Sequence, residues 1–371
     1  MLFRSYLGGG IALFWSDILG NHNLATALQV QYGNNMTDIS GLVGYMNTAS
    51  RWNWGGVVQQ VPYILSGYNI GYTTINNTPA YEQQQYVYRE TDREVRGIVA
   101  YPFNQSLRLE LSAGFTNLNF YQQVTTQAIS LYDGSVLVNS TTTIPSAPDI
   151  NLGTASVALV FDNSYFGATS PILGTRYRFE VGLNQGNLKW FDLLGDFRQY
   201  WMPIRPVTIA ARILQYGRYG ASADDYRLQP EFLGYPGLVR GYESSSFTSG
   251  EFQTDSAATY KTWNDLIGSK ILVGNLEIRF PLLGIFGLGE GFYGYFPIEM
   301  AFFYDAGLSW SNDQKIRLFG LHSDSRDPVT SAGVALRVNL FGYAVGEVDY
   351  VRPFNRPGVG WLWQFDIIEG F

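Results

Sequence analysis

The sequence contains no cysteine, few charges and no long hydrophobic run. Without cysteine the chain cannot be a disulfide scaffold, and its charged fraction of 15% lies well below the roughly 25% of soluble domains. No segment approaches the roughly 20 unbroken apolar residues of a membrane-spanning helix. The most apolar segment, Phe280–Leu288, is interrupted by Pro281, Gly284 and Gly287. The composition therefore excludes disordered, collagen-like and helical membrane proteins.

Basic residues and catalytic motifs are also scarce. The formal net charge is −7, whereas nucleic-acid binding depends on basic patches, so we expect no nucleic-acid partner. Only two histidines are present, and the motifs Gly-x-Ser-x-Gly and His-Glu-x-x-His are missing. The sequence therefore lacks the usual residues of a catalytic triad or a zinc site. We expect no enzyme activity, no cofactor and no metal site, and we interpret Asp224–Asp225 as solvated charge rather than a Ca2+ site.

Aromatic residues and glycine are abundant instead. The chain has 24 Phe, 26 Tyr and 9 Trp, together 16% of its residues, and it has 41 Gly. A soluble protein would have to bury these rings, whereas a membrane β-barrel displays them to lipid and at the membrane interfaces. The composition thus favours a membrane barrel.

Apolar and polar residues alternate along much of the chain, which is the period of a β-strand. In 107–115, leucine, alanine and phenylalanine alternate with arginine, glutamate, serine and glycine, and 24–32 and 176–184 follow the same rule. No segment has convincing helical periodicity. Charged residues in the middle of strands suit a water-filled lumen. The pattern predicts an all-β protein, a transmembrane antiparallel β-barrel.

The alternation divides the chain into about 16 strands, an even number as in bacterial outer-membrane barrels. The expected strands are 6–16, 22–33, 38–48, 53–65, 67–76, 85–101, 106–121, 150–162, 174–184, 188–200, 206–217, 269–280, 297–310, 329–341, 343–353 and 360–371. Three long loops, 124–149, 218–268 and 311–328, fall on the outer side if the first strand runs outward from the periplasm. We expect one barrel domain, residues 1–371.

The last expected strand carries a distinctive apolar face. Trp361, Trp363, Phe365, Ile367 and Phe371 share one parity, and Phe371 is the final residue of the sequence. A terminal strand that ends in an aromatic residue is the address read by outer-membrane assembly machinery. We therefore predict that Trp363, Phe365, Ile367 and Phe371 form a C-terminal assembly signal.

Three segments carry a family resemblance. They are Gln229–Glu243 (QPEFLGYPGLVRGYE), Gly274–Leu282 (GNLEIRFPL) and Phe302–Trp310 (FFYDAGLSW). In this order they resemble the outer-membrane insertase and bacterial surface antigen superfamily, which includes BamA- and TamA-like proteins, chloroplast import relatives and two-partner-secretion transporters. The first resembles the Val-Arg-Gly-Phe/Tyr motif of the sixth outer loop, here Val239, Arg240, Gly241 and Tyr242. The others resemble the twelfth strand and the thirteenth, with its core of Phe303, Asp305 and Gly307.

The resemblance has a physical rationale in the parity of the strands. Phe302 and Tyr304 lie on the expected lipid face, so Asp305 faces the lumen, as does Glu277 of the preceding strand. A loop spanning about 218–268 is long enough to fold back into the barrel. Arg240 at its tip would then meet Asp305 and Glu277, because a guanidinium can bind a carboxylate through two hydrogen bonds.

The resemblance implies a machine that inserts polypeptide into the outer membrane or translocates it across that membrane. The lumen loop and a weak lateral seam would do this work. Gly8, Gly9 and Gly10 of the first strand lack the cross-strand side-chain pairs that stabilise a ladder, so we expect the seam with the last strand to be weak. The implied partners are outer-membrane lipid, unfolded or nascent polypeptide, and periplasmic accessory modules. Full-length insertases carry POTRA domains before the barrel, whereas this chain begins directly at the first expected strand.

Two alternatives remain open at this point. A passive porin also shows strand alternation, but it has no need for the Arg240 loop and its acidic partners. The barrel could also be the membrane anchor and secretion channel of an effector domain fused to its N-terminus. The sequence does not name the client in either case.

Overall fold

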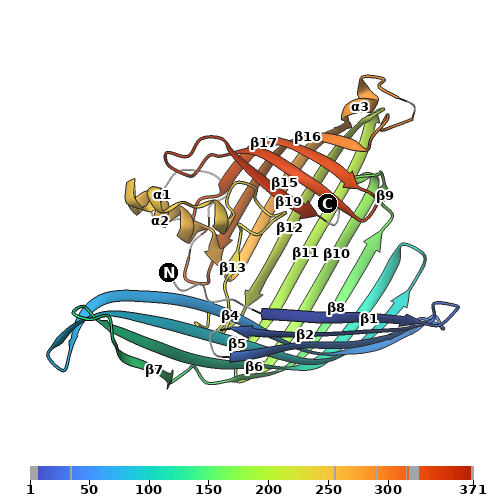
Figure 1. Ribbon diagram of the computed structural model, residues 1–371. Coiled ribbons are helices and arrows are strands. Elements are labelled where there is room, and N and C mark those ends of the chain that lie inside the picture. Colours follow the sequence, from blue (N-terminus) through green and yellow to red (C-terminus); the bar gives the residue numbers. More distant parts are fainter. Residues whose placement is uncertain are drawn as a thin grey trace. The chain divides into compact units, whose positions relative to one another are not determined.

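The computed structural model describes residues 7–33, 36–254, 256–289, 291–314, 316 and 326–368. These residues form long antiparallel strands with a few short helices (Figure 1). None of the helices among them is long and apolar enough to cross a membrane. The predicted all-β class is confirmed.

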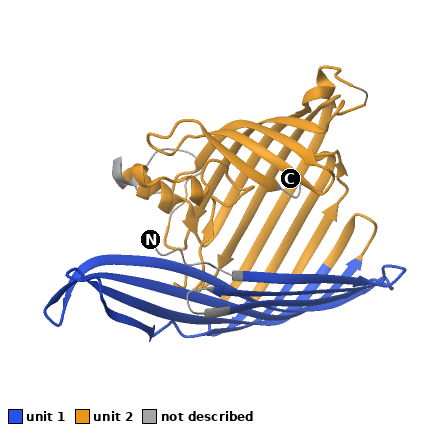
Figure 2. Cartoon of the chain, viewed as in Figure 1, with its two compact units in different colours: residues 1–101, 110–156, 184–188 blue, residues 102–109, 157–183, 189–371 orange. Residues whose placement is uncertain are grey.

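The chain forms two compact units, coloured separately in Figure 2. The first comprises residues 1–101, 110–156 and 184–188, and the second comprises 102–109, 157–183 and 189–371. Each unit is described by itself.

The first unit contains the N-terminal strands and nearly all of the three longest strands among the described residues. Its elements are β1 (Leu7–Ser16), β2 (His22–Gly33), β3 (Met36–Asn47), β4 (Asn53–Ile75), β5 (Thr78–Pro102), most of β6 (Leu107–Ser130) and β7 (Val136–Ile144). Successive strands from β1 to β5 pair antiparallel, as do β6 and β7.

Two sequence predictions in this unit are wrong. The expected strands 53–65 and 67–76 are one strand, β4, because the chain stays extended through Ser66 and pairs with β5 up to Ile75↔Thr78. The turn comes at Asn76 and Asn77, whose φ values are 47° and 65°, as a two-residue type I′ hairpin requires. The expected loop 124–149 instead contains the end of β6 and all of β7.

The second unit holds the remaining strands and the helices. They are β9 (Tyr165–Phe166), β11 (Lys189–Ile204), β12 (Val207–Tyr219), β13 (Glu231–Phe232), η1 (Ser244–Ser246), α1 (Ser249–Thr254), α2 (Ser256–Asp265), β14 (Ile267–Gly268), β15 (Lys270–Pro281), α3 (Leu282–Ile285), β16 (Ile298–Trp310), β17 (Val329–Leu340), β18 (Ala344–Pro353) and β19 (Leu362–Ile368). Two further strands, β8 (Ile150–Asp162) and β10 (Pro171–Gly186), are divided between the units, as are the ends of β5 and β6. From β11 to β19 the long strands pair antiparallel with their neighbours.

The predicted parity of the strands in this unit is confirmed. Phe302 and Tyr304 are about half exposed, whereas Asp305, which follows Tyr304 and points to the opposite face, is fully buried. On β19, Trp363, Phe365 and Ile367 are exposed, and Gln364 on the opposite face is buried. Phe371, the last residue of the predicted assembly signal, lies outside the described residues.

The long segment between β12 and β15 packs against the sheet through an apolar core. Leu233, Val239, Tyr242 and Leu266 of this segment are buried together with residues of the neighbouring strands, which are Leu214, Ile271, Val273 and Val329. The short strands β13 and β14 pair with each other and close the base of the loop. The segment is therefore a folded element rather than a flexible loop, and we call it the lumen loop (residues 220–269).

Candidate functional site

The apolar core of the lumen loop holds Arg240 against the sheet. Val239 beside it is buried, and the backbone N of Val239 donates to the carbonyl of Leu233 at 3.3 Å. The backbone N of Arg240 donates to Asp305 Oδ2 at 3.2 Å. Packing and backbone hydrogen bonds thus position Arg240 in addition to the contacts of its guanidinium.

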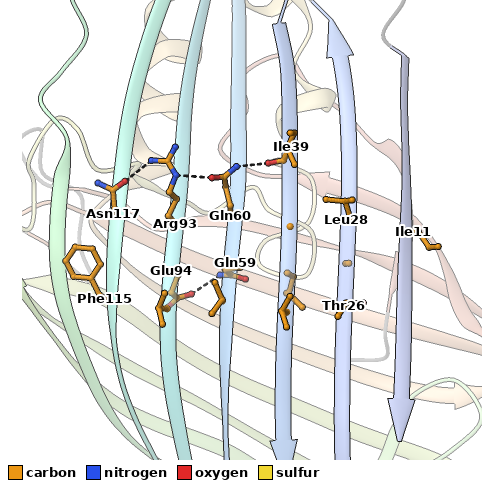
Figure 3. Close-up of a pocket in the computed structure, with 16 residues that line it drawn as sticks. Ile11, Thr26, Leu28, Ile39, Gln59, Gln60, Arg93, Glu94, Phe115 and Asn117 are labelled. Carbon is orange, nitrogen blue, oxygen red and sulfur yellow. Dashed lines mark hydrogen bonds between the residues drawn. The ribbon is translucent and has the colours of Figure 1, made fainter.

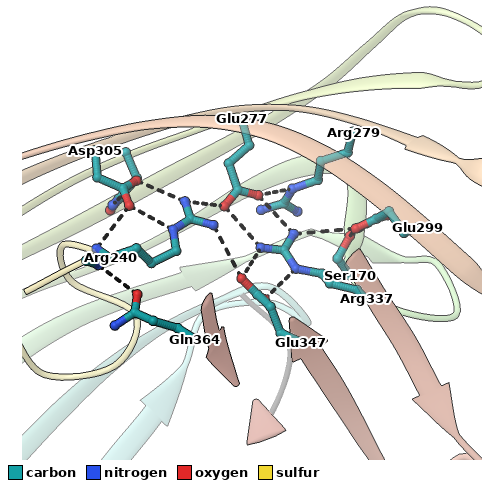
Figure 4. A network of polar contacts seen from close by, with 12 residues as sticks. Ser170, Arg240, Glu277, Arg279, Glu299, Asp305, Arg337, Glu347 and Gln364 are labelled. Carbon is teal, nitrogen blue, oxygen red and sulfur yellow. Dashed lines mark hydrogen bonds and ion pairs between the residues drawn. The ribbon is translucent and has the colours of Figure 1, made fainter. Parts of the chain in front are cut away.

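The guanidinium binds Asp305 through two hydrogen bonds (Figure 4). Nε lies 2.7 Å from Oδ2, and Nη2 lies 2.9 Å from Oδ1. Asn275, directly opposite Asp305 on β15, also donates to Oδ1, at 2.9 Å. The predicted ion pair is present, in the fork geometry that makes an arginine contact specific.

Two further carboxylates surround Arg240. Nη2 lies 2.8 Å from Glu277 Oε1, as predicted, and Nη1 lies 3.3 Å from Glu347 Oε1. Burial alone would lower the pKa of Arg240, but Asp305 and then Glu277 raise it well above its ordinary value. The loop therefore carries a permanent positive charge into a set of buried carboxylates, and removing it would leave Asp305 without its ion-pair partner.

Arg337 of β17 is a second centre of the same network (Figure 4). Its Nη1 lies 2.9 Å from Glu277 Oε2, and its Nε lies 2.7 Å from Glu347 Oε2. Arg279 adds a contact of 2.6 Å to Glu277 Oε2. Glu299 lies 3.4 Å from Arg337 Nη1. Two of the three carboxylates that hold Arg240, Glu277 and Glu347, are thus themselves bound by arginines of the strands.

Phe303 and Gly307 of β16 form the surface on which the loop tip rests. The Arg240 Cζ lies 3.4 Å from the centre of the Phe303 ring, which is within cation–π range. A Cβ at Gly307 would come within 2.5 Å of a methyl of Val239 and 3.1 Å of one of Leu233. The predicted motif residues therefore have separate roles, because Phe303 packs under the charge and Gly307 makes room for the loop.

Gly241 and Tyr242 complete the turn of the motif. Gly241 has a φ of +88°, which residues with a side chain rarely adopt. Its backbone N donates to Gln364 Oε1 of β19 at 2.7 Å. Arg356 Nη1 donates to the Gly241 carbonyl at 2.7 Å. Tyr242 is fully buried, and its hydroxyl donates to the Thr330 carbonyl at 2.9 Å. The tip of the loop is therefore tied to β16, β17 and β19.

The sequence predicts Arg240, Asp305 and Glu277 as members of this network. The members that it did not predict are Asn275, Arg279, Glu299, Arg337, Glu347, Arg356 and Gln364. Arg337 and Glu347 are directly opposite each other on β17 and β18. Their inward parity is readable from the strand pattern, but the register that brings them together is not.

The predicted seam residues Gly8, Gly9 and Gly10 lie in β1, opposite Gln31, Val30 and Gln29 of β2. A Cβ at Gly10 would lie 3.0 Å from the Leu28 carbonyl oxygen, so this glycine also permits a close approach between β1 and β2. The strands β1 and β19 belong to different units, and the seam between them stays a prediction.

The described acidic residues of the lumen loop form no group that could hold a metal. No group of three or more His, Asp or Glu side chains that could hold a metal occurs within the described part of the chain. Asp225 instead pairs with Arg227 at 2.9 Å.

Known proteins resemble this chain in sequence or in fold. A profile of the Omp85 superfamily domain matches residues 26–358. No curated protein matches the chain. BamA from Haemophilus ducreyi, solved without POTRA domains 1–3, is similar in structure with a TM-score of 0.51 and 15% identity, over 98% of this chain and 69% of that one. CdiB from Acinetobacter baumannii has a TM-score of 0.49 and 10% identity, over 98% and 57% of the two chains.

Proposed function

Because the chain belongs to the Omp85 superfamily, we propose that it assists the insertion of polypeptide into the outer membrane or its translocation across that membrane. The protein is an outer-membrane β-barrel of this superfamily, similar in fold to BamA. We further propose that both compact units are parts of one barrel domain. Its clients would be unfolded or nascent polypeptide, and its accessory partners periplasmic modules.

The contact between Arg240 and Asp305 supports this proposal most strongly. A passive pore needs an open lumen, and it has no use for a folded loop held by buried ion pairs. Here a bidentate arginine, at 2.7 and 2.9 Å from Asp305, fixes the loop to the strands that resemble the twelfth and thirteenth of the insertases. We propose that the lumen loop braces this wall while the barrel opens elsewhere.

The opening is proposed at a lateral seam between β1 and β19. Three successive glycines, Gly8, Gly9 and Gly10, give β1 no side chains for cross-strand pairs over that stretch. An opened edge can add a strand of the client through backbone hydrogen bonds. No nucleotide or cofactor is needed for such exchange.

Reconstitution tests the proposed function directly. The purified chain in liposomes should speed the folding of an urea-unfolded eight-stranded outer-membrane barrel, which is followed by its heat-modifiable mobility on a gel. Arg240→Ala should reduce this acceleration, while Arg352→Ala, an exposed arginine at the end of β18, should not. A wild-type protein that folds correctly in liposomes but leaves the client's rate unchanged would contradict the proposal.

Cysteine pairs test the seam. The chain has no native cysteine, so one cysteine in β1 and one in β19 can be oxidised without competing thiols. A locked seam should abolish the acceleration, and reduction should restore it. Full activity of the oxidised protein would exclude lateral opening, and a large steady single-channel conductance would favour the porin instead.

A further inference from the structure

The hairpin β4–β5 and the strand β6 are much longer than a membrane crossing requires. They contain 23, 25 and 24 residues, whereas a tilted crossing takes about 9–11. Arg93 of β5 donates to Gln60 at 2.9 Å and to Asn117 at 3.1 Å, which makes a polar row across the three strands (Figure 3). Val58, Val95 and Phe115, the next residues on the same face, are apolar and exposed. The strands therefore continue for more residues than one crossing needs.

Beyond this polar row the strands form a preformed sheet, which we call the extension (residues 61–92 and 118–144). The β4–β5 ladder runs without interruption to its type I′ turn. Tyr88 of β5 stacks on Phe120 of β6, with ring centres 6.2 Å apart, and Thr125 of β6 bonds to Thr141 of β7 at 3.0 Å. The Leu131 N donates to the Pro79 carbonyl at 2.9 Å. The extension is thus ordered before any partner binds.

One edge of the extension is open. The register of β3 on β4 runs from Asn47↔Trp54 to Gly41↔Gln60. Since β3 begins at Met36, continuing this register would end at Leu65. No described strand pairs with the outer edge of Ser66–Ile75. This segment therefore presents a row of backbone N–H and C=O groups to any strand that can approach it.

The open edge lacks the features that keep sheet edges from pairing. Natural edges are blunted by lysine, proline or bulges, but Ser66–Ile75 (SGYNIGYTTI) contains no charge and no proline, and its pairing with β5 is continuous. Tyr68, Ile70 and Tyr72 are exposed on one face. On the other face, a Cβ at Gly67 or at Gly71 would meet nothing within 4 Å.

We propose that the outer edge of Ser66–Ile75 binds an extended, uncharged polypeptide segment as an added β-strand. The backbone ladder supplies the affinity. Apolar side chains of the partner pack against Tyr68 and Tyr72, and its larger residues on the other face fill the space beside Gly67 and Gly71. This inference concerns a surface remote in sequence from the seam and the lumen loop, and it does not depend on the proposed function.

A labelled peptide tests the edge. The probe is a fluorescein-labelled ten-residue peptide of alternating valine and threonine, and its binding to the purified full chain in detergent is followed by anisotropy. A peptide of the same length with proline at every second position is the control, because proline removes ladder donors. Saturable binding of the first peptide alone is expected. Equal binding of both peptides, or binding of neither, would overturn the proposal.

A matched pair of variants locates the contact. Asn69 and Gln84 lie directly opposite each other on β4 and β5, so N69K and Q84K place the same charge on the same face, one at the edge and one a strand inward. N69K should weaken binding by about tenfold, because the charge must be desolvated when the strand docks. Q84K should change it less than about twofold, and a peptide with one central glutamate should restore binding to N69K.

Hydrogen exchange and oligomeric state give independent readouts. Peptide binding should slow amide exchange in Ser66–Ile75 and leave β7 unchanged. Equal weakening by N69K and Q84K, with no protection at the edge, would place the ligand on a sheet face and refute the proposal. A dimer of the free chain that N69K dissociates would show that a second copy occupies the edge, which would also refute it.

Discussion

The contacts of Arg240 with Asp305, Glu277 and Glu347, which we call the lumen-loop clamp, differ from the outer edge of β4 in how their polar groups are paired. At the clamp, Arg240 is buried among three carboxylates. Arg279 and Arg337 bind two of them, Glu277 and Glu347, and Asn275 donates to the third, Asp305. Along Ser66–Ile75 the outer backbone groups have no partner strand among the described residues. The first arrangement is complete within the chain and fixes one conformation, whereas the second is complete only when another strand is present.

The difference shows where charge is useful in this fold. Buried charges cost desolvation energy, and they are tolerated where fixed geometry compensates them, as at Arg240. An edge that exchanges partners gains from having no charge, because any partner strand must then desolvate only backbone groups. Substitutions at and around Arg240 test how much the contacts of the clamp stabilise the docked loop.

The largest effect is expected from Arg240→Ala. The substitution leaves Asp305 and Glu277 buried without their loop cation, which costs on the order of 3–5 kcal/mol. Urea unfolding in detergent should show this loss, and limited proteolysis should cut the lumen loop much faster. Arg352→Ala, at an exposed position, is the control and should change the unfolding free energy by less than about 0.5 kcal/mol. Equal stability of the two variants would mean that the clamp contributes nothing.

A smaller loss is expected from Gly307→Ala. The new methyl would lie within 2.5 Å of Val239, so the loop must shift, and overpacking of this kind costs about 1–3 kcal/mol. Gly274→Ala is a close control. Gly274 lies on β15 directly opposite Ala306, the neighbour of Gly307, and a Cβ added at Gly274 would meet nothing within 4 Å. Thermal unfolding of the two variants should differ clearly. If both behave as wild type, the loop does not rest on Gly307.

Tyr242→Phe should have a modest effect. The variant keeps the buried ring and loses the hydroxyl, which donates to the Thr330 carbonyl at 2.9 Å and accepts from the Asn355 backbone N at 3.1 Å. A net loss of about 0.5–1.5 kcal/mol for each hydrogen bond is expected, and urea titration measures it. Tyr235→Phe, at an exposed tyrosine of the same loop, should be neutral. A Tyr242→Phe variant as stable as wild type would show that the hydroxyl contact is not maintained.

The smallest effect is a pH dependence at Glu243, next to the loop motif. Burial and then the nearby Asp366 raise the pKa of Glu243 from 4.5 to about 7. A pKa raised in the folded state means that the docked loop holds a proton that the unfolded chain has released. Docking should therefore be strongest below about pH 4.5 and weaken as the pH rises to about 7.

Glu243→Gln isolates this contribution. Unfolding midpoints measured between pH 5 and 8 should fall more steeply with pH for the wild type than for the variant, because the glutamine does not titrate. Parallel pH profiles of the two proteins would show that Glu243 does not titrate with an altered pKa.

Much of this account could be predicted from the sequence, and the failures have physical causes. Strand parity placed Asp305 and Glu277 on the inner face, because alternation needs no knowledge of neighbours. It could not place Arg337 against Glu277, since contacts between strands that are not hairpin partners depend on register and curvature. The expected break between strands 53–65 and 67–76 is wrong, because pairing with β5 keeps Ser66 extended, and the turn lies at Asn76 and Asn77.

A double-mutant cycle on Arg240 and Asp305 tests the central claim most directly. The unfolding free energies of the wild type, Arg240→Ala, Asp305→Ala and the double variant are measured in the same detergent. Because the two side chains share two hydrogen bonds in a buried site, we expect the double variant to be less destabilised than the sum of the single ones, by at least about 1 kcal/mol. Additivity of the two substitutions within about 0.5 kcal/mol would contradict the account, because it would mean that the lumen loop is not clamped through this pair.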